Sequence, residues 1–524
     1  MESFQSFVAA VPWWGWVLFF FFVLFLRDII QRKHTITHNF PIVGHFRYML
    51  EKIGPELRQY IVANNREELP FNRSQRSWVY ASSKKQNNYS GFGSDQDQAS
   101  PGFVFINPTM LPYKPAPNHP NVTHVDLIPC AKVMGQYNKR KRPFRPKSIV
   151  NISAMSFGSL SAKAIESLNK GAKKADCYHN TGEGSLSYHH QHGADIVFQF
   201  GTGYFGVRTP EGNFDIDKMV KLVNDFDYIR AIEVKLSQGA KPGKGGVLPA
   251  SKITKEISEI RHVPMGKDVI SPSSHTAFSN IPELLDFIED IANNTGLPVG
   301  FKSAVGKLDM WEELTDLMVE RNIGPDFISI DGGEGGTGAA PPAFANHVSL
   351  PFVFGFSQVY QMFKRKNLTD RVVFIASGKL GFPSSALMAF SMGADLINVA
   401  REAMLSIGCI QALSCHTNTC PAGVATQNKW LQAGIDPTLK SERFYNYAKS
   451  LRKEILEITH ACGYEHPCQM EMTDVDMSMG DNNYTTTLRQ IYNYEKVPVD
   501  FISMEKLIEC EHLGGKSLKI QSVT

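Results

Sequence analysis

Three cysteines near residue 415 have the spacing of a ligand set for a redox metal centre. The segment CIQALSCHTNTCP gives the pattern C-x5-C-x4-C, with candidate ligands Cys409, Cys415 and Cys420. Three thiolates within one loop can ligate an iron–sulfur cluster, and three ligands rather than four favour the [3Fe-4S] form. Reduced structural cysteines would show the same spacing, and zinc would need a fourth ligand such as His416. Spacing alone leaves these three interpretations open.

Charged side chains follow short apolar runs elsewhere in the chain. Glu183 lies in NTGEG (180–184), and Lys235, Gln238 and Lys241 lie in KLSQGAK (235–241). A buried lysine or glutamate is unfavourable by several kcal/mol unless it meets a partner or a ligand. We therefore expect these residues to form a site for a charged ligand.

Glycines and further cations suggest a phosphate-bearing cofactor. Backbone N–H groups at glycines after strands can cradle a phosphate, and a cation beside a flavin ring stabilises its reduced, anionic form. This combination suggests flavin mononucleotide (FMN). Any one of these residues alone could be a turn glycine or a surface lysine. The residues are Lys302, Gly335, Gly336, Gly378, Lys379, Ala400 and Arg401.

Two G-x-G-x-x-G matches, at 201–206 and 333–338, do not indicate a dinucleotide site, because prolines follow where a helix would have to begin. Two histidine-containing groups are interpreted as structural. They are His189, His190 and His192, and His460, Cys462, His466 and Cys468.

The elements that position these residues alternate between apolar strands and helical stretches. Ser161 or Ser159, Ser251 and Asn280 are candidate helix caps. Eight strand-and-helix units predict an α/β protein with a (β/α)8 TIM barrel, and a doubly wound sheet is the alternative. In such a barrel, chemistry lies at the carboxyl ends of the strands. The eight candidate strands are 148–155, 176–180, 196–200, 231–236, 299–302, 327–331, 372–376 and 396–399.

An uncharged apolar stretch at residues 7–26 is long enough to cross a bilayer core of about 30 Å as a helix. Tryptophans at its start suit the membrane interface, and basic residues follow it. The positive-inside rule then predicts a single-pass protein of the inner (cytoplasmic) membrane with its catalytic body in the cytoplasm. A cleaved signal peptide and a buried core helix are the alternatives. The residues concerned are Trp13, Trp14, Trp16, Arg27, Arg32 and Lys33.

The composition excludes several classes of protein. With 43% hydrophobic and 20% charged residues, the chain has enough apolar residues for a large core and is not globally disordered. Its net charge of +3 argues against nucleic-acid binding driven by phosphate neutralisation. Eight cysteines in 524 residues are too few for a disulfide scaffold. A mean hydropathy of -0.20 excludes a polytopic membrane protein.

Over roughly residues 145–430 the sequence resembles the FMN-binding synthase domain of glutamate synthase. The phrases that carry the resemblance occur in the family's order. They are SAMSFGSLS (153–161), NTGEGS (180–185), KLSQGAKPGKGGVLP (235–249), ISPSSH (270–275), GGEGGTGAAP (332–341) and GCIQALSCHTNTCPAGVATQ (408–427).

The resemblance implies an oxidoreductase acting on CH–NH2 groups, in which a barrel holds FMN and a [3Fe-4S] cluster. It implies conversion of 2-oxoglutarate and ammonia, through 2-iminoglutarate, to L-glutamate. Lys235, Gln238 and Lys241 would hold the dicarboxylate, Glu183 would lie beside the reaction centre, and the three cysteines would bind the cluster. The FMN residues that the resemblance implies are Met155, Ser156, Gln199, Lys302, Gly335, Gly336 and Gly378, and the strand-end pattern adds Lys379, Ala400 and Arg401.

The expected organisation is an anchor with a basic flank (1–33), a mixed α/β extension (34–145), the barrel with its iron–sulfur loop (146–435) and a C-terminal extension (436–524). This differs from the complete family enzyme, because no glutaminase domain and no NAD-binding fold are recognisable. Ammonia would come from solution or a separate glutaminase subunit, and electrons from a ferredoxin or a reductase subunit.

Two residues also depart from the family pattern. Ser185 and Glu334 replace the family's usual glycine and aspartate. The alternatives are therefore an FMN barrel acting on a different 2-oxo acid or amino acid, and a membrane-tethered electron-transfer subunit.

Overall fold

The computed structural model describes residues 11–31, 35–117, 127–480 and 484–512. The chain separates into two compact units, Met1–Ser77 and Trp78–Thr524. The four-part division expected from the sequence stays a prediction. Residues 7–10 of the expected membrane span, its basic residues Arg32 and Lys33, and the side chain of Cys510 lie outside what the structure describes.

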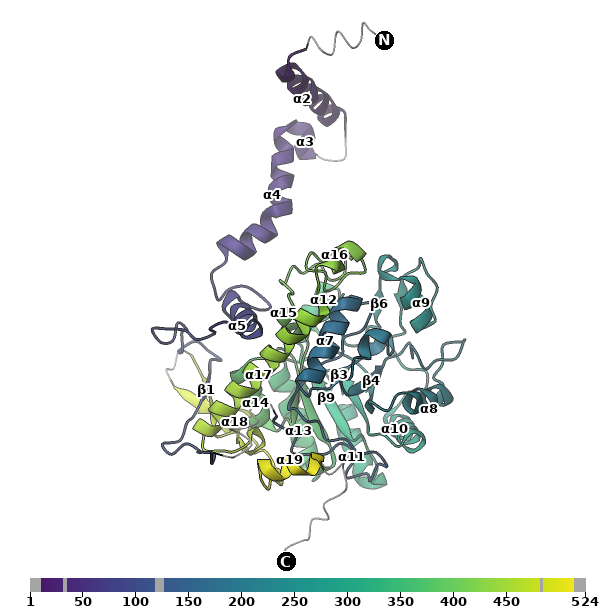
Figure 1. The fold of residues 1–524 in the computed structure, drawn as a ribbon, viewed down its shortest axis with the longest axis vertical. Helices are drawn as coiled ribbons and strands as arrows, with labels where there is room; N and C mark the ends of the chain where they lie inside the picture. The colour runs from purple at the N-terminus through teal and green to yellow at the C-terminus, as the bar shows by residue number, and fades with distance from the viewer. Residues whose placement is uncertain (1–10, 32–34, 118–126, 481–483, 513–524) are drawn as a thin grey trace, which may run out of the picture. The chain divides into compact units, whose positions relative to one another are not determined.

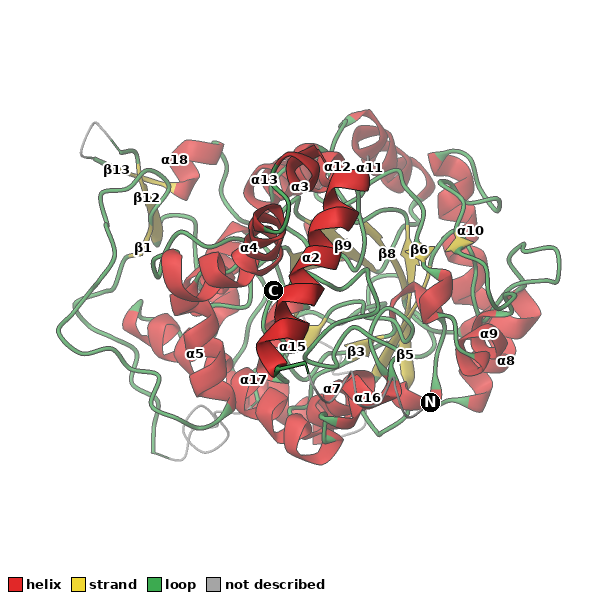
Figure 2. Cartoon of the chain, turned by 90° about the horizontal axis from the view of Figure 1, so that it is seen from above, coloured by secondary structure: helices red, strands yellow, loops and turns green. Residues whose placement is uncertain are grey.

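The second unit is built around a closed barrel. Within the described residues, eight strands close in the order β2-β3-β4-β5-β8-β9-β10-β11, and all neighbours, including β11 and β2, are parallel. Figure 2 shows yellow barrel strands among red helices. The predicted (β/α)8 barrel is confirmed. The strands are β2 (Val150–Ile152), β3 (His179–Asn180), β4 (Ile196–Phe200), β5 (Ile229–Lys235), β8 (Val299–Ser303), β9 (Phe327–Asp331), β10 (Val373–Ser377) and β11 (Leu396–Val399).

Capping side chains define where several helices of this unit begin. The hydroxyl of Ser161 accepts a hydrogen bond from the backbone of α7, and Asn280 does the same for α10, as predicted. The cap of α9 is Thr254 rather than Ser251, because Ser251 lies inside the short 3-10 helix η4 (Ala250–Lys252). The longer helices are α7 (Ala162–Lys174), α8 (Ile216–Asp225), α9 (Lys255–Arg261), α10 (Ile281–Thr295), α11 (Asp309–Arg321), α13 (Phe352–Arg365) and α14 (Pro383–Met392).

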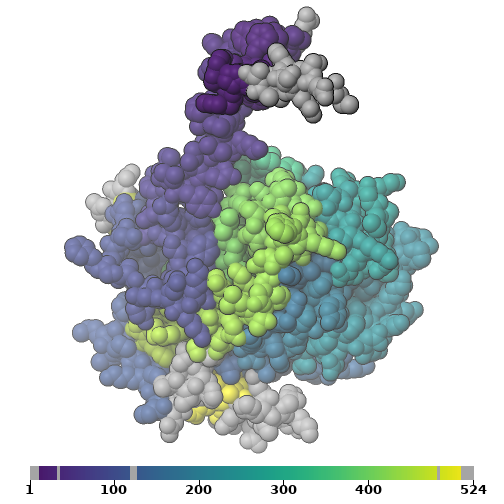
Figure 3. Space-filling view, turned by 45° about the horizontal axis from the view of Figure 1, so that its top comes forward, coloured from purple at the N-terminus to yellow at the C-terminus, as the bar shows by residue number. Residues whose placement is uncertain are grey.

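The C-terminal helix α17 (Pro437–Ala461) packs along α7 on the outside of the barrel (Figures 1 and 3). Its Arg452 is fully buried and donates hydrogen bonds to Ser148 Oγ at 2.9 Å and Ala175 O at 2.7 Å. Both acceptors lie beside barrel elements, so α17 belongs to the barrel's outer layer. Shorter neighbouring elements are η2 (Gly182–Gly184), η3 (Tyr188–His190), β6 (Val247–Leu248), β7 (Val269–Ile270), α12 (Pro342–His347), η5 (Thr369–Arg371), α15 (Arg401–Ser406) and α16 (Lys429–Ala433).

A small antiparallel sheet joins the sequence before the barrel to the sequence after it. In this sheet β12 (Val475–Ser478) lies between β1 (Val104–Ile106) and β13 (Thr485–Thr487). The segment around β1 and the segment around β12 and β13 therefore share one sheet, which the sequence pattern did not indicate. The remaining elements of this region are η6 (Pro467–Gln469), α18 (Leu488–Tyr492) and α19 (Met504–His512).

The first unit is helical. It contains α2 (Trp13–Ile30), α3 (Thr35–Asn39), α4 (Val43–Leu57) and the π-helical turn η1 (Arg58–Val62), while α5 (Arg73–Ser83) crosses its boundary. Among the described residues, α2 is the one helix whose length and apolar composition suit a membrane crossing. Only 6% of this 18-residue stretch is buried, whereas the core helix of a soluble domain is mostly buried.

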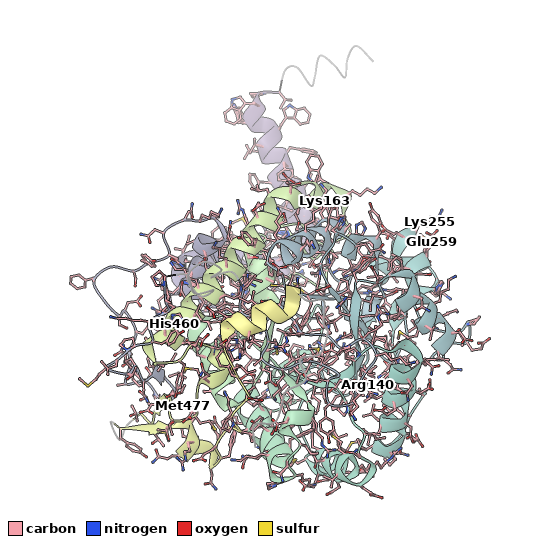
Figure 4. The ribbon with its side chains drawn as sticks, turned by 60° about the horizontal axis from the view of Figure 1, so that its bottom comes forward. Arg140, Lys163, Lys255, Glu259, His460 and Met477 are labelled. Carbon is pink, nitrogen blue, oxygen red and sulfur yellow. The ribbon has the colours of Figure 1, made fainter. Side chains whose placement is uncertain are left out.

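An ion-pair network lies at the amino ends of β8 and β9, the barrel end that usually serves stability rather than catalysis. Arg140, labelled in Figure 4, contacts Glu289 Oε1 at 2.6 Å and Asp326 Oδ2 at 2.9 Å. Asp326 also accepts hydrogen bonds from the backbone of Val299 and from Asn138. Arg140 is the shared cation of this network.

Replacing this arginine should destabilise the barrel without touching the catalytic end. Arg140→Met leaves two mostly buried carboxylates unpaired, so we expect the free energy of unfolding to fall by about 3–5 kcal/mol. Arg365→Met is the matched control, because its pair with Glu312 has side chains that are 60% and 44% exposed. The control should change stability by less than about 1 kcal/mol. Equal urea denaturation midpoints for the two variants would contradict the prediction.

Candidate active site

Glu183 and Lys235 meet at the carboxyl ends of two barrel strands. Glu183 lies in η2, directly after β3, and Lys235 ends β5. Lys235 Nζ is 2.9 Å from Glu183 Oε1 and donates a 2.7 Å hydrogen bond to Gln238 Oε1. Glycines allow this close packing, since a Cβ atom at Gly201 or Gly246 would lie 2.5 or 2.7 Å from the carboxylate oxygens. Three of the predicted catalytic residues are thus brought together.

Two further cations act on this carboxylate. They are Lys241, which is 5% exposed, and Arg261, which is 4% exposed. The sequence predicted Lys241 but not Arg261. Burial would raise the pKa of Glu183, but Lys235, Lys241 and Arg261 outweigh it and hold the pKa below its ordinary value. Glu183 is therefore ionised at neutral pH.

The two outer cations are themselves affected by burial. Burial, and next the charge of Lys235, lowers the pKa of Lys241, and burial lowers the pKa of Arg261 to about 10. Arg261 is the last residue of α9 and donates a 2.7 Å hydrogen bond to Phe157 O. It reaches the site from a helix, so no strand-end pattern could have indicated it.

His275 positions the end of β5. Its Nε2 donates to Lys235 O at 3.0 Å, and its Nδ1 accepts from the Tyr204 hydroxyl at 3.0 Å. The same hydroxyl accepts from the backbone N–H groups of Thr276 and Ala277. Burial lowers the pKa of His275, so the ring is neutral and its two nitrogens keep these distinct roles. His275 closes the ISPSSH phrase, which was the available sequence signal for it.

Lys302 and Asp331 form a second ion pair, across β8 and β9. Lys302 Nζ is 3.2 Å from Asp331 Oδ2, and this carboxylate also accepts from Gly239 N at 2.9 Å and Ser377 Oγ at 2.7 Å. Burial would raise the pKa of Asp331, but Lys302 and these donors hold it below its ordinary value. The pair links the ends of β8, β9 and β10 to the loop that follows Lys235.

A third carboxylate, Glu233, lies inside the barrel and is 1% exposed. It accepts hydrogen bonds from Asn180 Nδ2 at 2.7 Å, from Gln199 Nε2 and from Ser329 Oγ. Gln199, predicted to contact a cofactor, is held by this network. Glu233 was missed, although it lies two residues before Lys235 and so on the same face of the strand.

Cations and glycines gather after β10 and β11. Lys379 follows Gly378, and Arg401 follows Ala400, the N-cap of α15. Burial, followed by the charge of Arg401, lowers the pKa of Lys379, and burial lowers the pKa of Arg401. A bound anion would offset this mutual repulsion. The guanidinium of Arg401 donates to Glu334 O.

Backbone geometry at this end also suits a phosphate. Gly378 has a φ of +127°, which favours glycine, and a Cβ atom at Gly336 would lie 2.7 Å from Arg401 Cδ. Gly335 N donates to Gly332 O at 2.8 Å, which shapes the loop. These residues fit the phosphate of FMN, because they combine closely approaching backbone with two cations.

The loop after β2 carries the other two predicted cofactor residues. Met155 is 6% exposed, and its carbonyl oxygen lies 3.3 Å from His190 Nε2. Ser156 Oγ donates to Ser159 Oγ at 3.0 Å and accepts from Arg261 at 3.4 Å. Arg261 therefore connects this loop to the electrostatic surroundings of Glu183.

The predicted cluster ligands are brought together only in part. Cys415 and Cys420 interact electrostatically with each other and with Lys252. Lys252, 2% exposed, donates to Cys415 O at 2.7 Å and to Ser159 O at 3.0 Å, while Cys409 Sγ accepts from Gln411 N at 3.5 Å. Across the described ranges, no group of three or more His, Cys, Asp or Glu side chains is arranged to hold a metal ion. Cys415 and Cys420 therefore share Lys252 as a neighbour, and the three-cysteine ligand set stays a prediction.

The histidine groups have structural contacts. His466 Nδ1 accepts from Cys468 N at 3.0 Å, which caps η6, and its Nε2 donates to Pro129 O at 3.0 Å. His190 Nδ1 lies 2.8 Å from Ser187 Oγ. The buried Nε2 of His192 has no hydrogen-bond partner among the residues that the structure describes.

The chain is similar to several known proteins. Residues 117–465 match the protein family described as the conserved region in glutamate synthase. The glutamate synthase large subunit-like protein YerD of Bacillus subtilis is 40% identical over 85% of this chain and 90% of its own length. The archaeal-type glutamate synthase [NADPH] of Thermotoga sp. is 32% identical over 60% of this chain and 59% of its own. A solved mandelate oxidase with benzoyl-formic acid aligns with 73% of this chain and 86% of its own, at 13% identity and a TM-score of 0.41.

Proposed function

The chain belongs to the glutamate synthase family, because it contains that family's conserved region. We propose that it is an FMN-dependent oxidoreductase that forms L-glutamate. In this reaction 2-oxoglutarate and ammonia lose water to give 2-iminoglutarate, which takes up two electrons and two protons. Ammonia comes from solution or from a separate glutaminase subunit. Electrons come from a separate donor, either a ferredoxin or a reductase subunit.

The observation that carries the proposal is the charge balance around Glu183. Lys235, Lys241 and Arg261 supply three positive charges against one carboxylate, a surplus of two. A dicarboxylate brings two negative charges into a site that already has ammonium and amide donors. The surplus therefore matches 2-oxoglutarate, with Lys235, Gln238 and Lys241 as the proposed contacts.

Glu183 is the proposed proton carrier. Since its carboxylate is ionised, it can accept the proton that ammonia releases on adding to the carbonyl carbon. It can return that proton to the former carbonyl oxygen, which gives the carbinolamine, and then carry a second proton from the nitrogen to the departing hydroxyl group as water leaves. His275 and Lys235 hold the end of β5 in place during these steps through their own hydrogen bonds.

The residues proposed to hold FMN extend from the barrel interior to the ends of β10 and β11. Gly378, Lys379, Gly335, Gly336, Ala400 and Arg401 would hold its phosphate, and Met155, Ser156, Gln199 and Lys302 its ring. FMN would supply the two electrons. Lys302 has three N–H donors, so its pairing with Asp331 leaves donors for the edge of a flavin ring.

We also propose that the chain binds an iron–sulfur cluster. It is supported by the C-x5-C-x4-C spacing and by the proximity of Cys415, Cys420 and Lys252. We derive no reaction step through it. Membrane anchoring is likewise proposed, with α2 as the single span and the catalytic body on the cytoplasmic side.

The direct test is a steady-state assay on protein purified without oxygen. With a chemical electron donor, 2-oxoglutarate and ammonium, we expect glutamate to form, and flavin absorption should accompany the folded protein. Well-folded protein without flavin would overturn the FMN assignment. Intact flavin with no glutamate formed would instead overturn the substrate assignment.

A second candidate substrate is a different 2-oxo acid or amino acid. Ser185, two residues after Glu183, is 5% exposed and has a φ of 72°, a conformation that favours glycine. Position 206 must be glycine for this serine to fit, since a Cβ there would clash with Ser185 Oγ. A hydroxyl group near the reaction centre could alter substrate choice. Assays with a panel of 2-oxo acids separate the two candidates.

Binding of 2-oxoglutarate should weaken on the alkaline side because of Lys241. Its lowered pKa means that the ammonium loses its proton below the usual range of lysine as pH rises. We expect KM for 2-oxoglutarate to increase there while kcat changes little. Lys241→Arg should move the increase to higher pH, because a guanidinium stays charged. A KM that is flat over this range in the unaltered enzyme would contradict the prediction.

A further inference from the structure

One sector of α4 is apolar along its whole length. At about 100° per residue, six apolar side chains of this helix fall within an arc of about 120°. We call this arc the apolar face of α4. All six are well exposed. They are Val43 (71% exposed), Phe46 (58%), Met49 (48%), Leu50 (43%), Ile53 (41%) and Leu57 (40%).

The start of α4 is tied to the end of α2. His45 Nε2 lies 2.8 Å from Asp28 Oδ1, and Ile42 N donates to Asp28 Oδ2 at 2.9 Å. Gln31, which follows α2, donates to Thr37 Oγ1 at 3.0 Å. Figure 1 shows α2, α3 and α4 as successive helices of the first unit. These contacts fix where α4 begins and leave its apolar face uncovered.

This connection places the start of α4 at a defined depth. If α2 spans the bilayer, its last turn, which contains Arg27, lies at the membrane surface. Asp28 then holds the first turn of α4 at that same surface. A helix that starts there with a continuous apolar face has the features of an interfacial helix.

We propose that α4 lies in the membrane surface with its apolar face among the lipid acyl chains. This inference rests on the proposed membrane anchor. Arg47 lies just beyond one edge of the apolar face, where it can meet anionic headgroups, and Glu56 lies just beyond the other edge, while Lys52 lies outside the face. Beyond α4, Ile61 and Val62 in η1 are 73% and 74% exposed and extend the apolar surface. The lipid bilayer is thus the occupant that fits both the apolar area and the depth at which the Asp28 contacts hold the start of α4.

The test measures lipid contact in the full-length protein. An environment-sensitive fluorescent amino acid replaces Ile53, Lys52 or Phe21 in separate preparations, each reconstituted into vesicles of phosphatidylcholine and phosphatidylglycerol with brominated acyl chains. At position 53 we expect loss of most of the fluorescence by quenching. At position 52, which lies outside the apolar face, most of it should remain. Retained flavin absorption verifies that each preparation is folded.

Position 21, in the middle of α2, separates the two proposals. Quenching at 21 and 53 supports both. Quenching at 21 but not at 53 overturns the inference about α4, whether position 53 is then in water or against protein. No quenching at 21 overturns the membrane anchor itself. Equal quenching at 52 and 53 also overturns the inference, because it shows no orientation of the helix.

Discussion

Replacing Lys235 by methionine should lower kcat/KM for 2-oxoglutarate by about 10²- to 10⁴-fold. The ammonium pairs with Glu183 at 2.9 Å, and both side chains are mostly enclosed. Losing one partner of a buried charge pair costs about 2–5 kcal/mol of binding free energy, and each 1.36 kcal/mol in the activation barrier is about tenfold in rate. Part of the loss falls on substrate binding, since Lys235 is also a proposed carboxylate contact. Steady-state kinetics on FMN-replete protein measures the effect.

The pH profile distinguishes this role from a merely structural one. Among the influences that keep the pKa of Glu183 low, Lys235 is the largest. Without Lys235, burial raises that pKa, so Glu183 becomes protonated at higher pH than in the unaltered enzyme. The acid limb of kcat/KM should therefore move to higher pH in Lys235→Met. Glu183→Gln should remove that limb and most of the activity.

Lys255→Met is the matched control. Lys255 and Glu259, both labelled in Figure 4, are separated by 3.9 Å on α9 and are 83% and 66% exposed. An exposed pair of this kind contributes less than about 1 kcal/mol. We expect unchanged kinetics. A Lys235→Met variant with full physiological activity would contradict the glutamate-forming proposal and support a membrane-tethered electron-transfer subunit.

The barrel could be predicted from the sequence because its strands are short, apolar and separated by helices. Apolar runs at 196–200, 327–331 and 396–399 coincide with β4, β9 and β11. A parallel barrel also places all carboxyl strand ends on one rim. For that reason Glu183 and Lys235, which are 52 positions apart in the sequence, could be assigned to one site before their contact was known.

Other features depend on contacts that leave no periodic signal. Arg261 enters the site from the end of α9, a helix outside the regular alternation, and His275 acts through a backbone carbonyl of β5. The pairing of β1 with β12 joins segments more than 360 residues apart by backbone hydrogen bonds between strands of three and four residues, whose sequences carry too little pattern. Ser251 and Thr254 are both good caps, and only the start of α9 selects Thr254.

The glycine pattern indicated the proposed phosphate site after β10 and β11, but it did not show which glycines approach a ligand. Gly378 has positive φ, and Gly336 packs on Arg401, as close backbone approach requires. Yet the first of the two G-x-G-x-x-G matches contains Gly201, whose role is to make room for Glu183. Glycine thus occurs both at the proposed phosphate site and beside the proposed catalytic carboxylate. Only the packing around each glycine distinguishes the two roles.

Replacing Cys415 by serine should remove bound iron and leave FMN in place. Cys415 and Cys420 lie near Lys252, whereas the proposed phosphate contacts Lys379 and Arg401 lie after β10 and β11. A serine hydroxyl is a poor substitute for a thiolate ligand, so a cluster on this loop should not assemble. We expect iron and sulfide to fall to background, with loss of the cluster's electron paramagnetic resonance signal and unchanged flavin absorption.

Cys462→Ser provides the matched control, because Cys462 is a buried thiol (8% exposed) at the end of α17, outside the cysteine loop. It should keep both iron and flavin. The same comparison tests the third ligand, since Cys409 does not join a metal-holding group among the described residues. If Cys409→Ser loses iron as Cys415→Ser does, Cys409 completes the site on cluster assembly. If both variants retain stoichiometric iron and sulfide, the loop is structural and the cluster assignment is wrong.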